Sequence, residues 1–291
     1  MLFLRSVLLL VFGLGVGTLG TMIGVGGGWL HVPFLLLIFA FSPPMAIGTS
    51  IGIIFLNTLS GSIVYYTQKR MDWELAKRLA PAVIPGALFG PFIAQKFTTS
   101  AFFISFSVVL VLIAVCLFFK RGRAEGALRH GAATDGAIDA DAVARRYRIG
   151  IIGSLIIGFV ANVFGIGGGV IHVPFLILFL GVPTHVALGT SHFILCVSSC
   201  VGTIIYYAMG CVQVDFMMPI AAGTILGAPI GAELARRVDE SLIRRVLVVL
   251  LILLALRMAY TGIEHQVGDV PIVEQLPGHQ YMLLPMSTPI R

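Results

Sequence analysis

The amino-acid sequence predicts an all-helical protein that crosses a membrane several times and consists of two inverted repeats. Its 291 residues are 58% hydrophobic and only 11% charged, with a mean hydropathy of +1.00. Soluble domains carry about 25% charged residues, so a soluble fold would not hide this much apolar surface. Lipid is therefore the expected environment of most of the chain. This excludes the soluble α/β folds that glycine clusters would otherwise suggest.

The chain contains one sequence twice, at an offset of 141 residues. GVGGGWLHVPFL at 24–35 returns as GIGGGVIHVPFL at 165–176, and 14 of the 27 positions in 24–50 are identical to their counterparts. Apolar composition alone does not place a glycine run, a histidine, a proline and a Gly-Thr-Ser in the same register. Duplicated sets of apolar segments that are interrupted by glycine are typical of secondary transporters.

Five apolar segments are predicted in each repeat. They span 2–22, 29–41, 44–68, 73–94 and 101–119 in the first repeat, and 149–164, 170–180, 183–209, 216–235 and 242–262 in the second. The first of them resembles a signal peptide or signal anchor. Because 149–164 occupies the matching place in mid-chain, we expect the first segment to be retained as part of the repeat.

The second segment of each repeat is too short to span a bilayer. Residues 29–41 number 13, whereas a spanning helix needs roughly 20. The segment follows a glycine run and contains Pro33, and its counterpart contains Pro174. These features predict a discontinuous helix or a re-entrant hairpin whose break lies inside the membrane.

Lysine and arginine set the predicted orientation of the remaining segments. Fifteen of the 19 lie in three regions, 69–78, 120–148 and 236–245, and the alternate loops carry almost none. Placing all three regions in the cytoplasm requires an odd number of crossings per repeat, so the repeats face opposite ways. Treating the first two segments as one bent span would put 236–245 outside, and this alternative is rejected. The N-terminus, with Arg5, is then expected outside.

The predicted organisation has four parts. Residues 1–119 form the first transmembrane repeat, 120–148 a flexible cytoplasmic linker, 149–262 the second repeat, and 263–291 a poorly ordered tail. We expect a multi-pass protein of the cytoplasmic (inner) membrane. The basic excess lies in short loops where it sets topology, so no nucleic-acid partner is expected. Nothing in the sequence indicates an oligomeric state.

The two glycine runs are the first candidates for a binding site. They are Gly26-Gly27-Gly28 and Gly167-Gly168-Gly169. Consecutive glycines before a helix expose backbone N–H groups and let a ligand approach closely, and the helix dipole adds positive potential. This combination binds anions without a cationic side chain. The alternative is that these glycines only allow tight helix packing. Two copies, each followed by a truncated helix, favour a ligand site.

His31 and His172 follow the glycine runs by three residues, within the first turn of the short helices. An imidazole can donate a hydrogen bond to an oxyanion, or it can bond between helices. An ionisable side chain at mid-membrane is a functional candidate in either case.

Hydroxyl pairs stand near the start of the third segments. They are Thr49-Ser50 and Thr190-Ser191. These hydroxyls can coordinate a ligand or bond back to helix carbonyls, and the sequence does not separate the two. Asn57 and Asn162 are further polar residues in apolar runs, and each breaks the symmetry between the copies.

The apolar segments lack a deep Asp or Glu, which cation sites and proton relays usually show. This favours an anionic or neutral substrate. Arg257 is the one deep cation and is expected to snorkel to the membrane surface. Cys196 and Cys200 share a helix face. They are expected to be small packing residues, although with His192 they are also a possible soft-metal set.

The paired glycine runs, each followed by a proline and a Gly-Thr-Ser, resemble the TauE/SafE sulfite exporter family. The resemblance extends from about Gly13 to Gly262. It implies a polytopic permease of the cytoplasmic membrane for sulfite, organosulfonates or other small sulfur-containing anions. Carried over by position, it implies a site formed by Gly26, Gly27, Gly28, Pro33, Thr49 and Ser50, with Gly167, Gly168, Gly169, Pro174, Thr190 and Ser191.

The sequence thus predicts an anion transporter in which the two glycine breaks meet near the membrane midplane and alternating access moves one half against the other. His31 and His172 would lie close to the ligand, and no cofactor is expected. The alternatives are a soft-metal transporter that uses His31, His172, His192, Cys196 and Cys200, and a membrane-embedded enzyme or accessory subunit. The enzyme ranks low because no nucleophile–base pair or cofactor motif is present.

Overall fold

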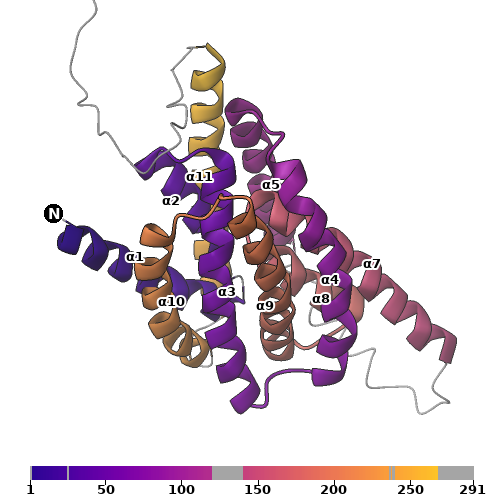
Figure 1. Cartoon of the computed structure of the whole chain (residues 1–291). Helices are drawn as coiled ribbons and strands as arrows, with labels where there is room; N and C mark the ends of the chain where they lie inside the picture. The colour runs from indigo at the N-terminus through magenta and orange to yellow at the C-terminus, as the bar shows by residue number, and fades with distance from the viewer. Residues whose placement is uncertain (1, 25, 120–139, 236, 238–239, 268–291) are drawn as a thin grey trace, which may run out of the picture.

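The computed structural model describes residues 2–24, 26–119, 140–235, 237 and 240–267, and in these the only regular secondary structure is helical (Figure 1). The prediction of an all-helical fold is confirmed. The first repeat contains α1 (Leu2–Ile23), α2 (Gly28–Phe39), α3 (Pro43–Thr67), α4 (Trp73–Ala94) and α5 (Thr99–Phe119). The second contains α7 (Ala140–Phe164), α8 (Gly169–Leu180), α9 (Thr184–Ala208), α10 (Val214–Leu234) and α11 (Glu240–Val267).

Eight of these ten helices begin and end within about two residues of the predicted segments, as the definition of helix ends allows. Two are longer. The first, α7, begins at Ala140, inside the predicted linker, because the stretch before Ile149 is rich in alanine and arginine, which favour helix. The second, α11, continues to Val267, five residues beyond the predicted end. The rest of the linker (120–139) and of the tail (268–291) lies outside the described residues.

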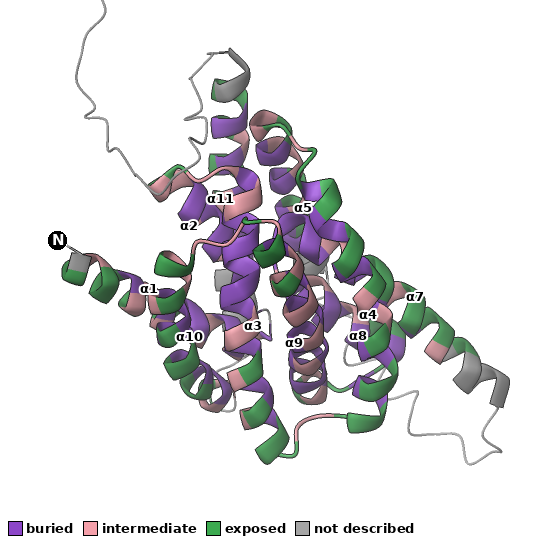
Figure 2. Cartoon of the chain, viewed as in Figure 1, coloured by how far each residue is buried: buried purple, intermediate pink, exposed green. Residues whose placement is uncertain are grey.

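Among the described residues, five helices are long and apolar enough to cross a membrane. They are Phe3–Ile23, Pro43–Thr67, Tyr147–Phe164, Thr184–Ala208 and Val214–Leu234. The short second segments are confirmed, since α2 and α8 have 12 residues each. Many large apolar side chains on the outer faces are exposed, as expected of a lipid-facing surface (Figure 2). The chain is therefore a multi-pass membrane protein.

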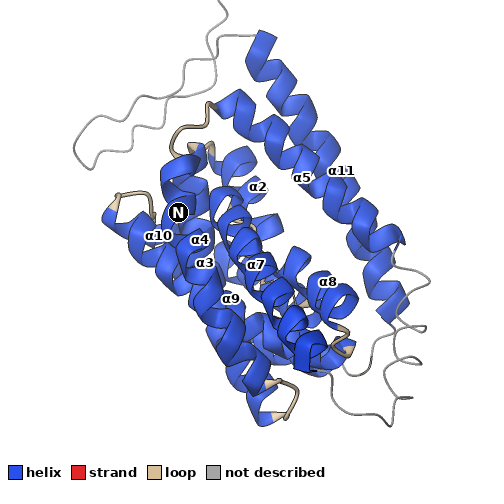
Figure 3. Ribbon diagram, turned by 90° about the vertical axis from the view of Figure 1, so that its right-hand side faces the viewer, coloured by secondary structure: helices blue, strands red, loops and turns tan. Residues whose placement is uncertain are grey.

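Helices of one repeat pack mainly against helices of the other. α1 packs along α10 of the other repeat, and its counterpart α7 packs along α4. The central pair is α3 with α9, and the remaining pair is α5 with α11, which lies along one side of the molecule (Figure 3). Each first helix thus has the fourth helix of the other repeat as its main partner, so neither repeat packs as a separate domain.

Small residues let α1 and α10 approach closely. A Cβ atom at Gly13 would collide with the backbone of Ile220, and one at Gly17 would collide with Thr224. In return, a Cβ at Gly227 would meet Thr18 on α1. The residue numbers rise together along both helices, so the two run in the same direction. This is the close packing of small residues at a spacing of four that drives helix association in lipid.

The central helices α3 and α9 run in opposite directions. The Thr49 hydroxyl, near the start of α3, accepts a hydrogen bond from the backbone N–H of Gln213, just after α9 ends (3.0 Å). The Thr190 hydroxyl, near the start of α9, accepts the equivalent bond from Asp72, just after α3 ends (3.0 Å). Equivalent helices of the two repeats are therefore antiparallel at the centre. The inverted orientation of the complete repeats across the membrane stays a prediction.

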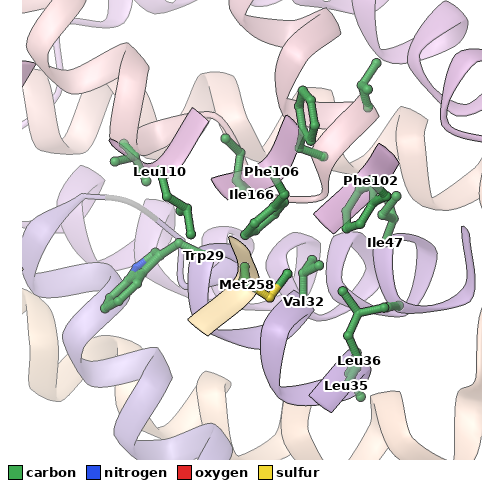
Figure 4. Packing of buried hydrophobic residues seen from close by; sticks show 14 of the residues in the cluster. Trp29, Val32, Leu35, Leu36, Ile47, Phe102, Phe106, Leu110, Ile166 and Met258 are labelled. Carbon is green, nitrogen blue, oxygen red and sulfur yellow. The ribbon is translucent and has the colours of Figure 1, made fainter. Parts of the chain in front are cut away.

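The largest buried apolar cluster joins the α5–α11 pair to the glycine breaks. Trp29 at the start of α2 and Ile166, just before the second glycine run, belong to this cluster, together with Phe106 of α5 and Met258 of α11 (Figure 4). All four side chains are at most 1% exposed. The packing of α5 and α11 thus fixes the position of the two breaks.

Candidate functional site

Each glycine run forms a left-handed turn that starts a short helix. The φ angles of Gly26 and Gly27 are +79° and +85°, and those of Gly167 and Gly168 are +76° and +68°. L-residues rarely adopt such angles, which explains why the sequence has glycine here. Gly27 and Gly168 are the N-cap residues of α2 and α8 and, as glycines, provide no capping side chain. The positive end of each helix dipole is therefore not neutralised by a cap.

The two breaks lie against each other. A Cβ atom at Gly28 would collide with the carbonyl oxygen of Gly165 and with Ile166, so the start of α2 touches the two residues that precede the second glycine run. The Ser50 hydroxyl donates a 2.9 Å hydrogen bond to the same Gly165 carbonyl. The expectation that the glycine breaks approach each other therefore agrees with this geometry. Gly28 and Ser50 contribute to the contact between the repeats.

Gly26 lies where the first break meets the central helices. A Cβ atom there would stand 3.3 Å from side-chain methyls of Ile54 and Thr58 on α3, and 3.4 Å from Leu195 on α9. Its carbonyl oxygen accepts a hydrogen bond from the Asn57 amide (3.2 Å). Gly26 thus has neighbours in both repeats.

Both repeated histidines are fully buried but do not come together. The His31 ring packs edge-on against Phe12 of α1, with centroids 6.1 Å apart. His172 instead makes a 3.1 Å hydrogen bond through Nε2 to the Ser154 hydroxyl on α7. Position 13, which corresponds to Ser154, is a glycine, and neither ring nitrogen of His31 bonds to a described residue. Each histidine therefore faces the first helix of its own repeat.

The predicted hydroxyl residues have different partners. Thr49 and Thr190 fix the loops that follow α9 and α3, as described above. Ser50 bonds to the opposite glycine run, whereas its counterpart Ser191 is fully buried and its hydroxyl has no partner among the described residues. Three of these four hydroxyls thus bond across the repeat interface, a role that the sequence analysis did not consider.

The prolines interrupt the hydrogen-bond ladders of the short helices. Pro33 and Pro174 are buried inside α2 and α8. Proline has no N–H to donate, so the carbonyls of Trp29 and Val170, four residues earlier, lack their usual helical donor. Both lie in the first turn, next to the glycine runs.

A matched pair of polar contacts was missed by the sequence analysis. The Thr21 hydroxyl donates to the Asn57 side-chain oxygen (3.4 Å), and the Asn162 amide donates to the Ser198 hydroxyl (2.9 Å). Positions 21 and 162 correspond, as do 57 and 198. Both repeats therefore have the same polar contact, with the amide on opposite partners. A comparison of positions 21 and 57 with positions 162 and 198, at the offset of 141, would have shown that each pair combines one amide with one hydroxyl.

His192 is the histidine that lies between the repeats. It is fully buried, and its ring packs edge-on against Tyr65 of α3, with centroids 5.3 Å apart. The Cδ2–Nε2 edge faces Gly61, where a Cβ would stand 2.7 Å from Cδ2. At the equivalent place in the other half, Ile51 faces Gly202. One half thus has an imidazole where the other has a hydrocarbon.

Among the residues that the structure describes, the buried polar side chains include none with a fixed charge. Among the described residues that are buried, the polar side chains are hydroxyls, amides and imidazoles, without a carboxylate, lysine or arginine. Nor does the described part of the chain bring three His, Cys, Asp or Glu side chains together in a way that could hold a metal ion. The Arg257 guanidinium lies 5.8 Å from the ring centroid of exposed Tyr260.

Comparison with known proteins gives one family. The model of the family described as sulfite exporter TauE/SafE matches residues 9–258. The chain is 30% identical over 268 residues to the probable membrane transporter protein YunE of Bacillus subtilis, covering 88% of this chain and 98% of that protein. It is 25% identical over 252 residues to the probable membrane transporter protein MJ0441 of Methanocaldococcus jannaschii, covering 81% and 89%.

A plant protein is also similar. The Sulfite exporter TauE/SafE family protein 3 of Arabidopsis thaliana is 27% identical over 128 residues, covering 44% of this chain and 26% of that protein. No solved structure gives a significant match.

Proposed function

Because this chain belongs to the TauE/SafE sulfite exporter family and is a membrane transporter, we propose that it carries small sulfur-containing anions out of the cell. Sulfite and short organosulfonates are the proposed substrates. The proposed location is the cytoplasmic membrane, with the basic loops on the cytoplasmic side.

The observation that carries the proposal is the meeting of two helix starts that have no side-chain cap. The left-handed glycines at Gly27 and Gly168 start α2 and α8, and Gly28 lies against Gly165. Backbone N–H groups and helix N-termini bind oxyanions without a cationic side chain. The described interior supplies further neutral donors and no buried carboxylate that would repel an anion. Both facts favour an anion over a cation.

Transport by alternating access is part of the proposal. The exchange of helix contacts between repeats gives two matched sets, α1 with α10 and α7 with α4, around the antiparallel α3–α9 pair. One helix set can move against the other while the glycine breaks stay between them, as in transporters of inverted repeats.

The test is flux in proteoliposomes that contain the purified full-length protein. Labelled sulfite and methanesulfonate are the anion probes, and Ni²⁺ and Cu⁺ represent the soft-metal alternative. We expect saturable flux of at least one sulfur anion and competition between the two, with no metal flux above that of protein-free vesicles. Metal flux without anion flux would overturn the proposal, and so would the absence of any flux.

A further inference from the structure

His192 occupies a place that neither repeated histidine has. It belongs to α9 of the second repeat, and its ring contacts Tyr65 and Gly61 of α3 in the first repeat. The Thr21 methyl of α1 also lies 3.3 Å from the position of a Gly61 Cβ, so α1 closes the same spot. His31 and His172, by contrast, face α1 and α7 of their own repeats. The helices form two sets that each mix the repeats, α1 with α3 and α10, and α7 with α4 and α9, and His192 lies where the sets meet. Movement of one set against the other would therefore change the surroundings of His192 in particular.

The ring nitrogens of His192 are free to bind a proton. Neither ring nitrogen forms a hydrogen bond with a described residue. The side chain is 0% exposed. An imidazole is the one side chain whose charge ordinarily changes near neutral pH, and a buried one inside a membrane requires a functional explanation.

The first repeat lacks this group at the equivalent position. Ile51 stands at the equivalent position, against Gly202, and the neighbouring Asn162 amide is bonded to Ser198 and to the Gly158 carbonyl (2.8 Å). The two halves are otherwise matched at the tyrosines, the threonines and the polar pairs. Of the two equivalent places, only the one that holds His192 thus has a group that titrates near neutral pH.

We propose that His192 binds and releases the proton that couples anion transport to the transmembrane proton gradient. This inference rests on the proposed function. When the two helix sets are closed around the ring, as in this structure, the imidazole is held away from solvent. When they part, a ring nitrogen becomes accessible to water and takes up a proton, and a protonated ring attracts the anion at the neighbouring break around Gly26.

The other groups near His192 do not replace it. The ring faces the phenol of Tyr65 on α3, and Cys196 follows one turn later on its own helix. The ordinary pKa values of both groups lie above about 8, so neither changes charge near neutral pH in its ordinary state. The charged residues on the elements packed against α9 lie near or beyond the ends of α3, α4 and α7. They are Lys69, Arg70 and Asp72 in the loop between α3 and α4, Glu74, Lys77 and Arg78 of α4, Lys96 after α4, and Asp141, Arg145, Arg146 and Arg148 near the start of α7.

The experiment compares two transport modes in proteoliposomes. Counterflow of labelled substrate at equal pH on both sides requires no net proton movement, whereas gradient-driven accumulation does. Methanesulfonate and sulfite are the probes, and methanesulfonate decides the result because a sulfonate keeps its charge throughout the working pH range. Proton movement is followed with a pH-sensitive dye trapped inside the vesicles.

We expect the parental protein to accumulate substrate when a pH gradient is imposed and to move protons with it. His192→Gln should retain counterflow and lose both gradient-driven accumulation and the proton signal. The matched control is Ile51→Gln, which introduces the same amide at the equivalent place and should keep both. His192→Asn, with a smaller side chain, serves as the second variant should glutamine not be accommodated.

Gradient-driven accumulation by either His192 variant at the parental level would overturn the inference and leave the proposed function standing. Loss of the proton signal in Ile51→Gln as well would also overturn it, because the effect would then come from any amide at this level of the bundle. No counterflow of either anion by the parental protein would overturn the proposed function, and the inference with it.

Discussion

The Tyr65 hydroxyl donates a 2.8 Å hydrogen bond to the backbone carbonyl of Thr21, near the end of α1. Tyr206 makes the same bond, also 2.8 Å long, to Asn162 near the end of α7, and each bond spans 44 residues. Both tyrosine rings are fully buried. The central helices thus hold the end of each first helix just before the chain enters a glycine run. This relationship connects the packing of the bundle to the position of the breaks.

Tyr65→Phe and Tyr206→Phe should each lower the stability of the folded protein by about 1 kcal/mol, the usual net value of a hydrogen bond, and by more where the carbonyl stays buried without a donor. Thermal unfolding in detergent measures the effect. The neighbouring Tyr66 and Tyr207 are 63% and 65% exposed, so phenylalanine there should leave the unfolding temperature unchanged. Equal shifts for the buried and exposed pairs would show that these hydrogen bonds do not position the breaks.

Gly17→Val should prevent α1 from packing against α10, because a side chain there would overlap the backbone of Thr224. We expect little folded protein in the membrane, measured as the monodisperse fraction after extraction. Gly15→Val is the matched control on the same helix, since a Cβ at Gly15 has no described atom within 4 Å. Normal yield of the Gly17 variant would contradict the packing of α1 along α10.

The double variant His31→Gln and His172→Gln should weaken sulfite binding without removing it. Glutamine still donates a hydrogen bond, and the helix N-termini remain. Loss of one charge-assisted hydrogen bond costs roughly 1.5–3 kcal/mol, or about ten- to a hundredfold in affinity. Titration calorimetry checks this. Tight Ni²⁺ or Cu⁺ binding by the parental protein that disappears in the variant would instead support the metal hypothesis, because glutamine is a poor ligand for such ions.

The inverted orientation of the repeats is tested by cysteine labelling in a cysteine-free background. Gly131→Cys, in the linker, should react only from the cytoplasm, and Gln213→Cys, after α9, only from outside, because the basic loops are expected in the cytoplasm. Membrane-impermeant maleimide applied to intact cells and to inverted vesicles distinguishes the two sides. Reaction of both positions from one side would be incompatible with inverted repeats.

Most helix ends could be predicted from the sequence because apolar runs end where lysine, arginine, proline or glycine begins. The pairing of α1 with α10 was not predicted, although Gly13 and Gly17 share the spacing of Gly223 and Gly227. Hydropathy gives the length of a helix, whereas its partner depends on which small residues face each other across the bundle.

The candidate site was predicted in part. The breaks at the glycine runs and their approach were predicted from the duplication and from the shortness of the second segments, whereas the left-handed φ angles are seen only in the structure. The bonds of Thr49 and Thr190 to the opposite repeat were not, since a sequence does not show which loop follows which helix in space. The location of His192 between the repeats was not predicted for the same reason. In addition, comparison of the two copies singles out the histidines that are repeated, and His192 is not one of them.

The central claim, that a sulfur anion binds where the glycine breaks meet, is tested most directly by calorimetry with sulfite on the parental protein and on Gly27→Val and Gly168→Val. Both glycines have left-handed φ angles, and a Cβ would stand 2.9 Å from Val16 at one and from Ala161 at the other. Each variant should insert into the membrane yet lose sulfite binding and transport, because the side chain blocks approach to the backbone. Parental sulfite affinity in both folded variants would contradict the claim.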